Sequence, residues 1–202
     1  MMGMLTATCN NASNETEPTV DSTAKEQSVA PSQPAANDYA DSVNMGLLTT
    51  DTLKGSPHRV AMAIVDSNHV HIEYNSPGVR GRAIWGALVP YDKIWVTGAH
   101  SATSVQFAKD VMIGDKKVPA GKYALFTIPG KDNWTIILNK QYEQHQADKY
   151  KQNEDVARVS VKPQEHEMTQ RLTYEVKDGE GKNAEIEVRW EKVQVSLPFT
   201  TI

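Results

Sequence analysis

Alternating apolar and polar residues dominate the chain beyond residue 53, and the clearest example is the segment 68–75. Apolar residues occupy every second position and polar residues lie between them: Val70, Ile72 and Tyr74 against His69, His71 and Glu73. A period of two places the two sets on opposite faces of a β-strand. The pattern predicts that the apolar set faces a core, while the histidines and Glu73 share the outer face. Ser76-Pro77-Gly78 then ends the strand, because proline has no N–H to donate.

Similar short apolar segments follow at regular intervals, separated by turn residues such as Gly114-Asp115 and Asp178-Gly179. They predict strands over 60–64, 83–89, 93–97, 104–109, 122–128, 134–139, 156–162, 169–176, 184–190 and 192–197, and a hairpin over 111–118. Residues 141–153 are polar and poor in β-branched side chains, so we expect a short helix or irregular excursion there. About ten short strands and no long amphipathic helix predict an all-β fold. The expected architecture is an antiparallel β-sandwich resembling a jelly roll, or a flattened barrel.

The first 52 residues differ in composition from the rest of the chain. Residues 10–52 are rich in Asn, Ser, Thr, Ala, Gln and Pro, and residues 1–50 hold six acids and one base, a net charge of −5. Residues 51–202 are close to neutral, at +1. The N-terminal segment lacks the apolar area needed to offset the entropy cost of ordering. We therefore predict a disordered acidic linker over 10–52 and a β-sandwich domain over 53–202.

The single cysteine, Cys9, follows a short apolar start and the small residues Thr6-Ala7-Thr8. An apolar run, small residues, a cysteine and a polar tail resemble the end of a bacterial lipoprotein signal, in which the cysteine is lipidated after cleavage. Leu5 is one place too far from Cys9 and no Lys or Arg precedes the run, so we expect an upstream start outside the given sequence. Residues 1–9 would then be a signal-peptide remnant, with membrane lipid as a partner through Cys9. The alternative is an ordinary free cysteine in a disordered terminus.

Composition and missing patterns exclude several classes of protein. One cysteine allows no intrachain disulfide. A near-neutral folded part gives no electrostatic case for binding nucleic acid. The sequence contains no phosphate-binding glycine loop before a helix, no dinucleotide fingerprint and no G-x-S-x-G nucleophile elbow. It therefore assigns no reaction, and whether the protein is an enzyme stays open.

Three segments together resemble the bacterial domain-of-unknown-function family 2911: SPGVRGRAIWGALVPYDKIW (76–95), KDVMIGDKKVPAGKYALFTIPGKDNWTIILNK (109–140) and RWEKVQVSLP (189–198). The resemblance covers about residues 55–199, and the PAGKY, LFTIPG and WTIILNK block is its most specific part. Members of this family are mostly secreted or lipid-anchored envelope proteins, often from Bacteroidota. The resemblance implies a β-rich domain of the bacterial cell envelope with no established activity. Such a domain would be anchored in the outer membrane and lie in the periplasm or at the surface.

The chain departs from the family pattern at several positions. The family tends to carry arginine before the proline where this chain has Ser76, and asparagine at the end of Trp-Arg-Thr-Gly-Ala-Asn where this chain has His100. A tryptophan-glycine pair of the family is replaced by His145-Gln146. Two family positions have become histidine, so the roles of the usual residues do not carry over. A separate histidine site becomes a hypothesis.

Histidines at i and i+2 of a strand, such as His69 and His71, project the same way and can share one metal ion. With His100 or His145 from a loop, three imidazoles would leave an open position that suits Zn²⁺ or Cu²⁺. Asp148 is close to His145 in sequence, so it could be a ligand or a hydrogen-bond acceptor, as could Glu73 on the strand. The sequence thus suggests a metal site at His69, His71, His100, His145 and Asp148. The alternative, which the pattern favours, is a polar strand face exposed to water.

Arg80 and Arg82, with Glu73 nearby, could bind a carboxylate or phosphate, because the guanidinium fork suits oxyanions. The alternative is structural pairing with Asp92, Glu73 or backbone carbonyls in a glycine-rich corner. A sugar-stacking platform is a further hypothesis, and its members would be Trp85, Tyr91, Trp95 and Trp134. Because most of these residues lie among other hydrophobes, the pattern favours core packing instead.

Three functions follow from these patterns. The first is a non-enzymatic, lipid-anchored envelope module that binds a partner protein, a glycan or a small ligand. The second is a metal-binding protein or metal-dependent enzyme that uses His71, His100 and His145. The third is a structural subunit of an envelope assembly.

Overall fold

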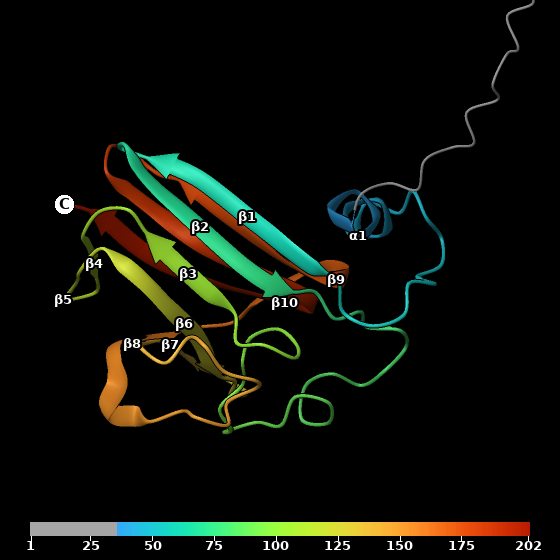
Figure 1. Ribbon diagram of the computed structural model, residues 1–202. Helices are drawn as coiled ribbons and strands as arrows, with labels where there is room; N and C mark the ends of the chain where they lie inside the picture. Colours follow the sequence, from blue (N-terminus) through green and yellow to red (C-terminus); the bar gives the residue numbers. More distant parts are fainter. Residues whose placement is uncertain (1–35) are drawn as a thin grey trace, which may run out of the picture. The chain divides into compact units, whose positions relative to one another are not determined.

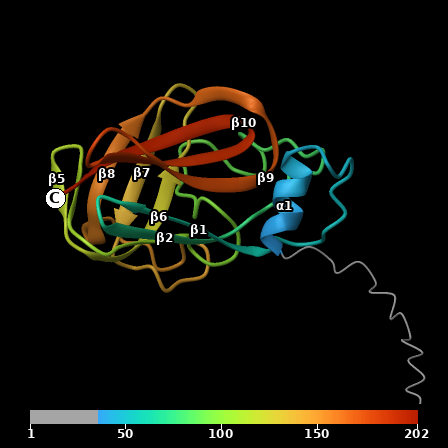
Figure 2. The same cartoon turned by 90° about the horizontal axis from the view of Figure 1, so that it is seen from above.

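Two antiparallel β-sheets face each other across one hydrophobic core (Figures 1 and 2). The computed structural model describes residues 36–202, with side chains from Tyr39 onward, and these residues belong to one compact unit that begins at Pro34. The elements are α1 (Ala36–Asn44), β1 (His58–Val65), β2 (Asn68–Asn75), β3 (Ser104–Phe107), β4 (Val111–Ile113), β5 (Lys116–Val118), β6 (Gly121–Ile128), β7 (Trp134–Asn139), the 3₁₀ helix η1 (Gln152–Glu154), β8 (Asp155–Val161), β9 (Gln164–Asp178) and β10 (Asn183–Thr201). The all-β sandwich predicted from the sequence is confirmed, and among the described residues the sheets do not close into a barrel.

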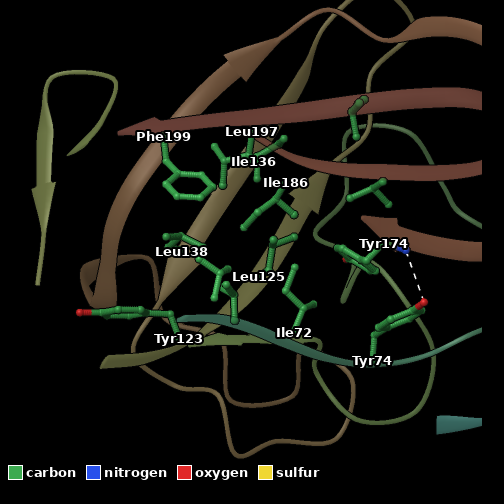
Figure 3. Close-up of a cluster of buried hydrophobic side chains, with 14 of the residues drawn as sticks. Ile72, Tyr74, Tyr123, Leu125, Ile136, Leu138, Tyr174, Ile186, Leu197 and Phe199 are labelled. Atoms are coloured by element: carbon green, nitrogen blue, oxygen red, sulfur yellow. Dashed lines mark hydrogen bonds between the residues drawn. The ribbon is translucent and has the colours of Figure 1, made fainter. Parts of the chain in front are cut away.

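One sheet has six strands in the order β1-β2-β3-β6-β7-β8, and the other has four in the order β5-β4-β10-β9. The side chains of β2 alternate as the sequence predicts. Val70, Ile72 and Tyr74 are buried, while His71 and Glu73 lie on the outer face. The sheets meet through side chains of this inward set. Figure 3 shows Ile72 of β2 and Leu125 of β6 pointing toward Ile186 of β10. Each such side chain contributes about 1.5–3 kcal/mol by leaving water.

The four tryptophans form one contiguous cluster at the core. Trp85 lies edge-on to Trp134 and Trp190, with ring centroids 4.9 and 5.8 Å apart, and Trp95 stacks on Trp190 at 5.7 Å. Trp134 and Trp190 are buried and the other two pack against the same core. Core packing, rather than a sugar-stacking platform, therefore accounts for these rings.

A second, smaller core covers the outer face of the six-stranded sheet. Ala124 and Phe126 of β6 and Ile137 of β7 point away from the sandwich interior, yet they are buried. The loop before β3 and the excursion between β7 and β8 cover them, because Val96 and Ala102 of the loop and Tyr142, Ala147 and Tyr150 of the excursion pack there. The irregular excursion predicted for 141–153 is confirmed, and its role is to shield this part of the sheet.

Residues 83–97 were predicted as two strands but form an irregular loop with isolated bridges only, Trp85 to Val89 and Trp95 to Thr127. Gly86 and Asp92 have positive φ values of 79° and 57°, so the chain turns before a ladder can extend. Ile84 and Val89 of this segment are buried in the main core, and Val96 is buried in the smaller core. The strands expected at 184–190 and 192–197 are instead one long strand, β10, with an irregular register at Glu191.

The structure also differs from the predicted linker boundary at residue 52. Residues 36–44 form α1, whose Ala40 and Val43 are buried beside β9 (Figure 2). Asn44 accepts a hydrogen bond from the backbone N–H of Arg171 at 2.7 Å and donates one to its carbonyl at 3.0 Å. The apolar i, i+3 spacing of Ala40 and Val43 was too short a signal to reveal this helix. Cys9 and the first part of the predicted linker lie outside the described residues.

A buried arginine fastens the segment after α1 to the sandwich. Arg171 of β9 has a fully buried side chain, which donates to Asp51 Oδ1 at 2.7 Å, to the Gly55 carbonyl at 3.0 Å and to the Ser76 carbonyl at 3.1 Å. Its guanidinium also donates to the carbonyl of Leu53. Because a buried charge is tolerated only when it is paired and hydrogen-bonded, these contacts fix the path of residues 51–55. None of the helices in the described residues is long and apolar enough to cross a membrane.

Candidate functional site

The two strand histidines lie side by side on the outer face of β2. The ring centroids of His69 and His71 are 5.9 Å apart, and His71 Nε2 is 3.4 Å from Glu73 Oε1. The residues paired with His71 on the neighbouring strands are Met62 of β1 and Gln106 of β3. The sheet register therefore places no third imidazole or carboxylate opposite His71.

The two loop histidines are brought together by their backbones. The Gln146 N–H donates to the His100 carbonyl at 2.6 Å, and Ser101 forms a bridge with His145. His145 Nδ1 is 3.4 Å from Asp148 Oδ2, with both side chains 68% exposed. In the part of the chain from Tyr39 to the C-terminus, no three His, Cys, Asp or Glu side chains are grouped closely enough to hold a metal ion. Metal binding by His69, His71, His100, His145 and Asp148 stays a prediction.

The two arginines of the glycine-rich corner have different surroundings. Arg82 donates to the carbonyls of Val79 and Gly78, which is the structural pairing with backbone that the sequence left open. Arg80 lies 3.8 Å from Asp51 and is not paired with Asp92 or Glu73. The corner therefore does not act as one double-arginine fork.

Glu73 is the centre of a polar network on the outer face of the six-stranded sheet. Lys122 Nζ donates to Glu73 Oε2 at 2.7 Å, and the Ser104 hydroxyl lies 3.4 Å from the same oxygen. The hydrogen bond from Lys122 holds the pKa of Glu73 below its usual range, and partial burial offsets this only in part. Glu73 is therefore ionised at neutral pH and Lys122 is its counter-ion.

The register of three strands assembles this network. His71 pairs with Gln106, and Gln106 with Lys122, so these residues form one row across β2, β3 and β6. Glu73 and Ser104 belong to the next row, in which Ser104 is the diagonal neighbour of Lys122 and Glu73 lies one strand further away. Lys122 and Glu73 lie on strands separated by β3, so the long lysine side chain reaches the carboxylate across Ser104 of the intervening strand.

A pocket of about 310 Å³ opens beside Glu73, where the loop cover of the sheet ends and the polar strand face begins. We call it the Glu73 pocket, and it is lined by His58, Glu73, Tyr74, Asn75, Ser101, Ala102, Ser104, Lys122, Tyr142 and Glu143. Lys122 Nζ also lies 5.6 Å from the centroid of the Tyr142 ring, which ties the excursion to the sheet through a cation–π contact.

The loop that forms one wall of the Glu73 pocket has an unusual backbone. Thr97 is buried and has a φ of 51°, and His100 has a φ of 61°. Positive φ is a clear outlier for a β-branched residue and costs of order 1–3 kcal/mol. Buried contacts offset this cost, because the Thr97 carbonyl accepts hydrogen bonds from Tyr174 Oη at 2.8 Å and Thr103 Oγ1 at 3.1 Å. Gly98 follows, and a Cβ there would lie 2.9 Å from Thr103 Oγ1, so only glycine fits without a shift.

The floor and the rim of the Glu73 pocket differ in how their polar groups are used. Glu73, Lys122 and Ser104 at the floor are bound to one another. The rim side chains of His58, Asn75, Ser101 and Glu143 make no hydrogen bond with other described residues. A fixed floor and an unpaired rim can present donors and acceptors to a small polar ligand.

Sequence reasoning identified Glu73 but missed Lys122, Ser104 and the excursion residues. Lys122 precedes buried Tyr123 at the start of β6, and strand alternation could have placed it on the outer face. Its meeting with Glu73 depends on the order β2-β3-β6, which sequence patterns do not specify. Tyr142 and Glu143 lie in an irregular segment, where no periodicity gives a direction.

The chain was compared with known proteins and protein families. No curated protein and no solved structure matched. The profile of one family, described as proteins of unknown function (DUF2911), matches residues 56–199, which include all strands except the last two residues of β10, and every residue of the Glu73 pocket. The match covers most of the sequence and agrees with the resemblance seen in the PAGKY, LFTIPG and WTIILNK block. The chain therefore belongs to the DUF2911 family.

Proposed function

We propose that this protein is a binding module of the bacterial envelope that holds a small, hydroxyl-rich ligand in the Glu73 pocket. The observation that carries the proposal is the pairing of a fixed ionic floor with an unpaired polar rim in a pocket of about 310 Å³. This volume is at the lower end of the range for small-molecule sites, about 300–1,000 Å³. It suits a ligand about the size of one sugar ring.

Charge limits the class of ligand. Glu73 and Lys122 neutralise each other, which leaves Glu143 as the uncompensated carboxylate of the lining. A neutral or singly cationic ligand with several hydroxyl or amino groups fits this balance, because it can donate to Glu143 and to the Asn75 amide oxygen. An anionic ligand would meet repulsion at the rim.

The first test compares two exposed glutamates. Glu143→Gln keeps the shape of the rim but removes its charge and weakens its acceptor, so we expect affinity for a bound sugar or amino sugar to fall about five- to tenfold. Binding of glucose, glucosamine and N-acetylglucosamine to the purified full chain would be followed by saturation-transfer NMR and calorimetry. Glu180→Gln makes the same chemical change in the exposed turn between β9 and β10 and is the matched control.

Two outcomes would contradict the binding proposal. One is that none of the three sugars binds at millimolar concentration. The other is that Glu143→Gln and Glu180→Gln have equal affinities, which would show that the rim carboxylate does not touch the ligand.

Anchoring in the envelope is the second part of the proposal, and the position of Cys9 after an apolar start supports it. A thioether-linked lipid on Cys9 would hold the domain at a membrane surface, with residues 10–35 as a spacer. Expressed from its native gene in a bacterial host, the protein is expected in the membrane fraction and to incorporate an alkyne-labelled fatty acid. Cys9→Ser should abolish the label and move the protein to the soluble fraction. Label that persists in Cys9→Ser would disprove anchoring at this residue.

A further inference from the structure

A second and larger pocket lies next to the end of α1, away from the Glu73 pocket. Its volume is about 570 Å³, and it is lined by Val43, Asn44, Gly46, Leu48, Thr49, Thr50, Asp51, Thr52, Arg80, Met168 and Gln170. The segment between α1 and β1 forms one wall, and β9 forms another. Figures 1 and 2 both show this segment beside α1 and β9. We call this second cavity the Arg80 pocket.

The charges around the Arg80 pocket do not balance. The Asp51 side chain is 6% exposed, and its Oδ1 accepts a hydrogen bond from Arg171 at 2.7 Å. Its Oδ2 has no hydrogen bond and lies 3.8 Å from Arg80 Nε. One carboxylate thus faces two guanidinium groups. Arg171 is fully buried behind the pocket wall and is held by backbone carbonyls, so the uncompensated positive charge at the pocket is that of Arg80.

Arg80 is placed to receive a ligand. Its side chain is two-thirds buried, at 33% exposed, and no group of the described residues hydrogen-bonds its terminal nitrogens. Its backbone has a φ of 49°, a left-handed conformation that is uncommon outside glycine and recurs where a side chain is held for binding. Arg82 makes no contribution, because its guanidinium is bound to loop carbonyls.

The rest of the lining has two kinds of surface. The hydroxyls of Thr49 and Thr50 and the amide of Gln170 make no hydrogen bond with other described residues, so they can serve a ligand. Leu48 and Met168 line the same space and are more than a third exposed. A ligand here meets one cationic fork, several neutral polar groups and an apolar wall.

We propose that the Arg80 pocket binds a small organic carboxylate that carries an apolar group. The two oxygens of a carboxylate match the two parallel N–H donors of a guanidinium, and one negative charge matches the single excess positive charge. A phosphate ester carries nearly two charges, which would exceed this balance. The apolar group of the ligand would lie against Leu48 and Met168. This site differs from the Glu73 pocket in place and in the sign of the charge it accepts.

The test uses benzoate, acetate and inorganic phosphate as probes on the full chain. Amide NMR shifts are expected to follow benzoate binding at residues 48–52 and around Arg80, with benzoate bound at least fivefold more tightly than acetate because it also covers apolar surface. Arg80→Gln should weaken benzoate binding about tenfold or more. Arg80→Lys, which keeps the charge but loses the fork, should give an intermediate loss. Lys131→Gln removes an exposed positive charge outside the pocket and should leave binding unchanged.

Three results would overturn the assignment. Equal benzoate affinity in Arg80→Gln and Lys131→Gln would show that only overall charge matters. Phosphate bound more tightly than benzoate would assign the pocket to a phosphorylated ligand instead of a carboxylate. Benzoate shifts centred on Glu73 and Glu143 would place the anion in the other pocket. Circular dichroism of Arg80→Gln and Arg80→Lys checks that both variants are folded.

Discussion

Replacing Arg171 with methionine is expected to lower the free energy of unfolding by about 3–5 kcal/mol, because it leaves the buried Asp51 carboxylate without its main partner. The same change removes the donors that hold the carbonyls of Leu53, Gly55 and Ser76. Urea unfolding followed by tryptophan fluorescence measures the effect as a lower midpoint with an unchanged slope. A loss this large would be a substantial part of the 5–15 kcal/mol that keeps a typical domain folded.

The partner and a surface pair provide the controls for the Arg171 experiment. Asp51→Asn combined with Arg171→Met should be more stable than the sum of the single losses predicts, because the double variant no longer buries a lone charge. Lys116→Met breaks an exposed pair with Asp115 and should cost less than about 1 kcal/mol. If Arg171→Met costs no more than Lys116→Met, the arginine is not what fastens residues 51–55.

Replacing Trp190 with alanine is expected to destabilise the sandwich by about 3–5 kcal/mol, since it removes a buried ring from the aromatic cluster and leaves a cavity. Trp190 is 2% exposed and contacts the rings of Trp85 and Trp95, with centroids 5.8 and 5.7 Å away. The near-ultraviolet circular dichroism of the remaining tryptophans should weaken at the same time, because they lose the ring that fixes their orientation.

Leu88→Ala is the control for the Trp190 experiment. Leu88 is 45% exposed, so trimming it should change the free energy of unfolding by less than about 0.5 kcal/mol. A cost of about 1 kcal/mol or less for Trp190→Ala would mean that the cluster collapses around the gap and that the four rings do not act as one packed unit.

Strand alternation predicted the part of the fold that depends on one face being buried. Val70, Ile72 and Tyr74 face the core as their period requires, and the hairpin at 111–118 forms β4 and β5. These predictions succeed because side-chain period and turn chemistry are local properties. Residues 83–97 are equally apolar, but their buried side chains belong to a loop. Hydrophobicity in this segment predicts that its side chains are buried, but it does not predict whether the backbone forms hydrogen bonds with a neighbouring strand.

The sequence predicted the candidate sites only in part, because their residues come from segments far apart in the chain. The outward direction of Glu73 follows from its own strand, whereas its contact with Lys122 needs the register of two further pairs of strands. Arg171 gives no local signal that it is buried, because Leu172 and Tyr174 mark the core face of β9 and alternation places Arg171 on the opposite face with Thr173. Long-range pairings of this kind, such as Arg171 with Asp51, are properties of the assembled fold.

The Arg171 contact has a consequence for where this domain can be cut. The family profile begins at residue 56, but Asn44 and Asp51, which satisfy the backbone and the guanidinium of Arg171, lie before that point. A shortened chain starting at Ser56 would retain every strand but lose Asp51, Leu53 and Gly55, which leaves the Ser76 carbonyl as the remaining acceptor for the Arg171 guanidinium. The shared family segment is therefore narrower than the compact unit of this protein, which begins at Pro34.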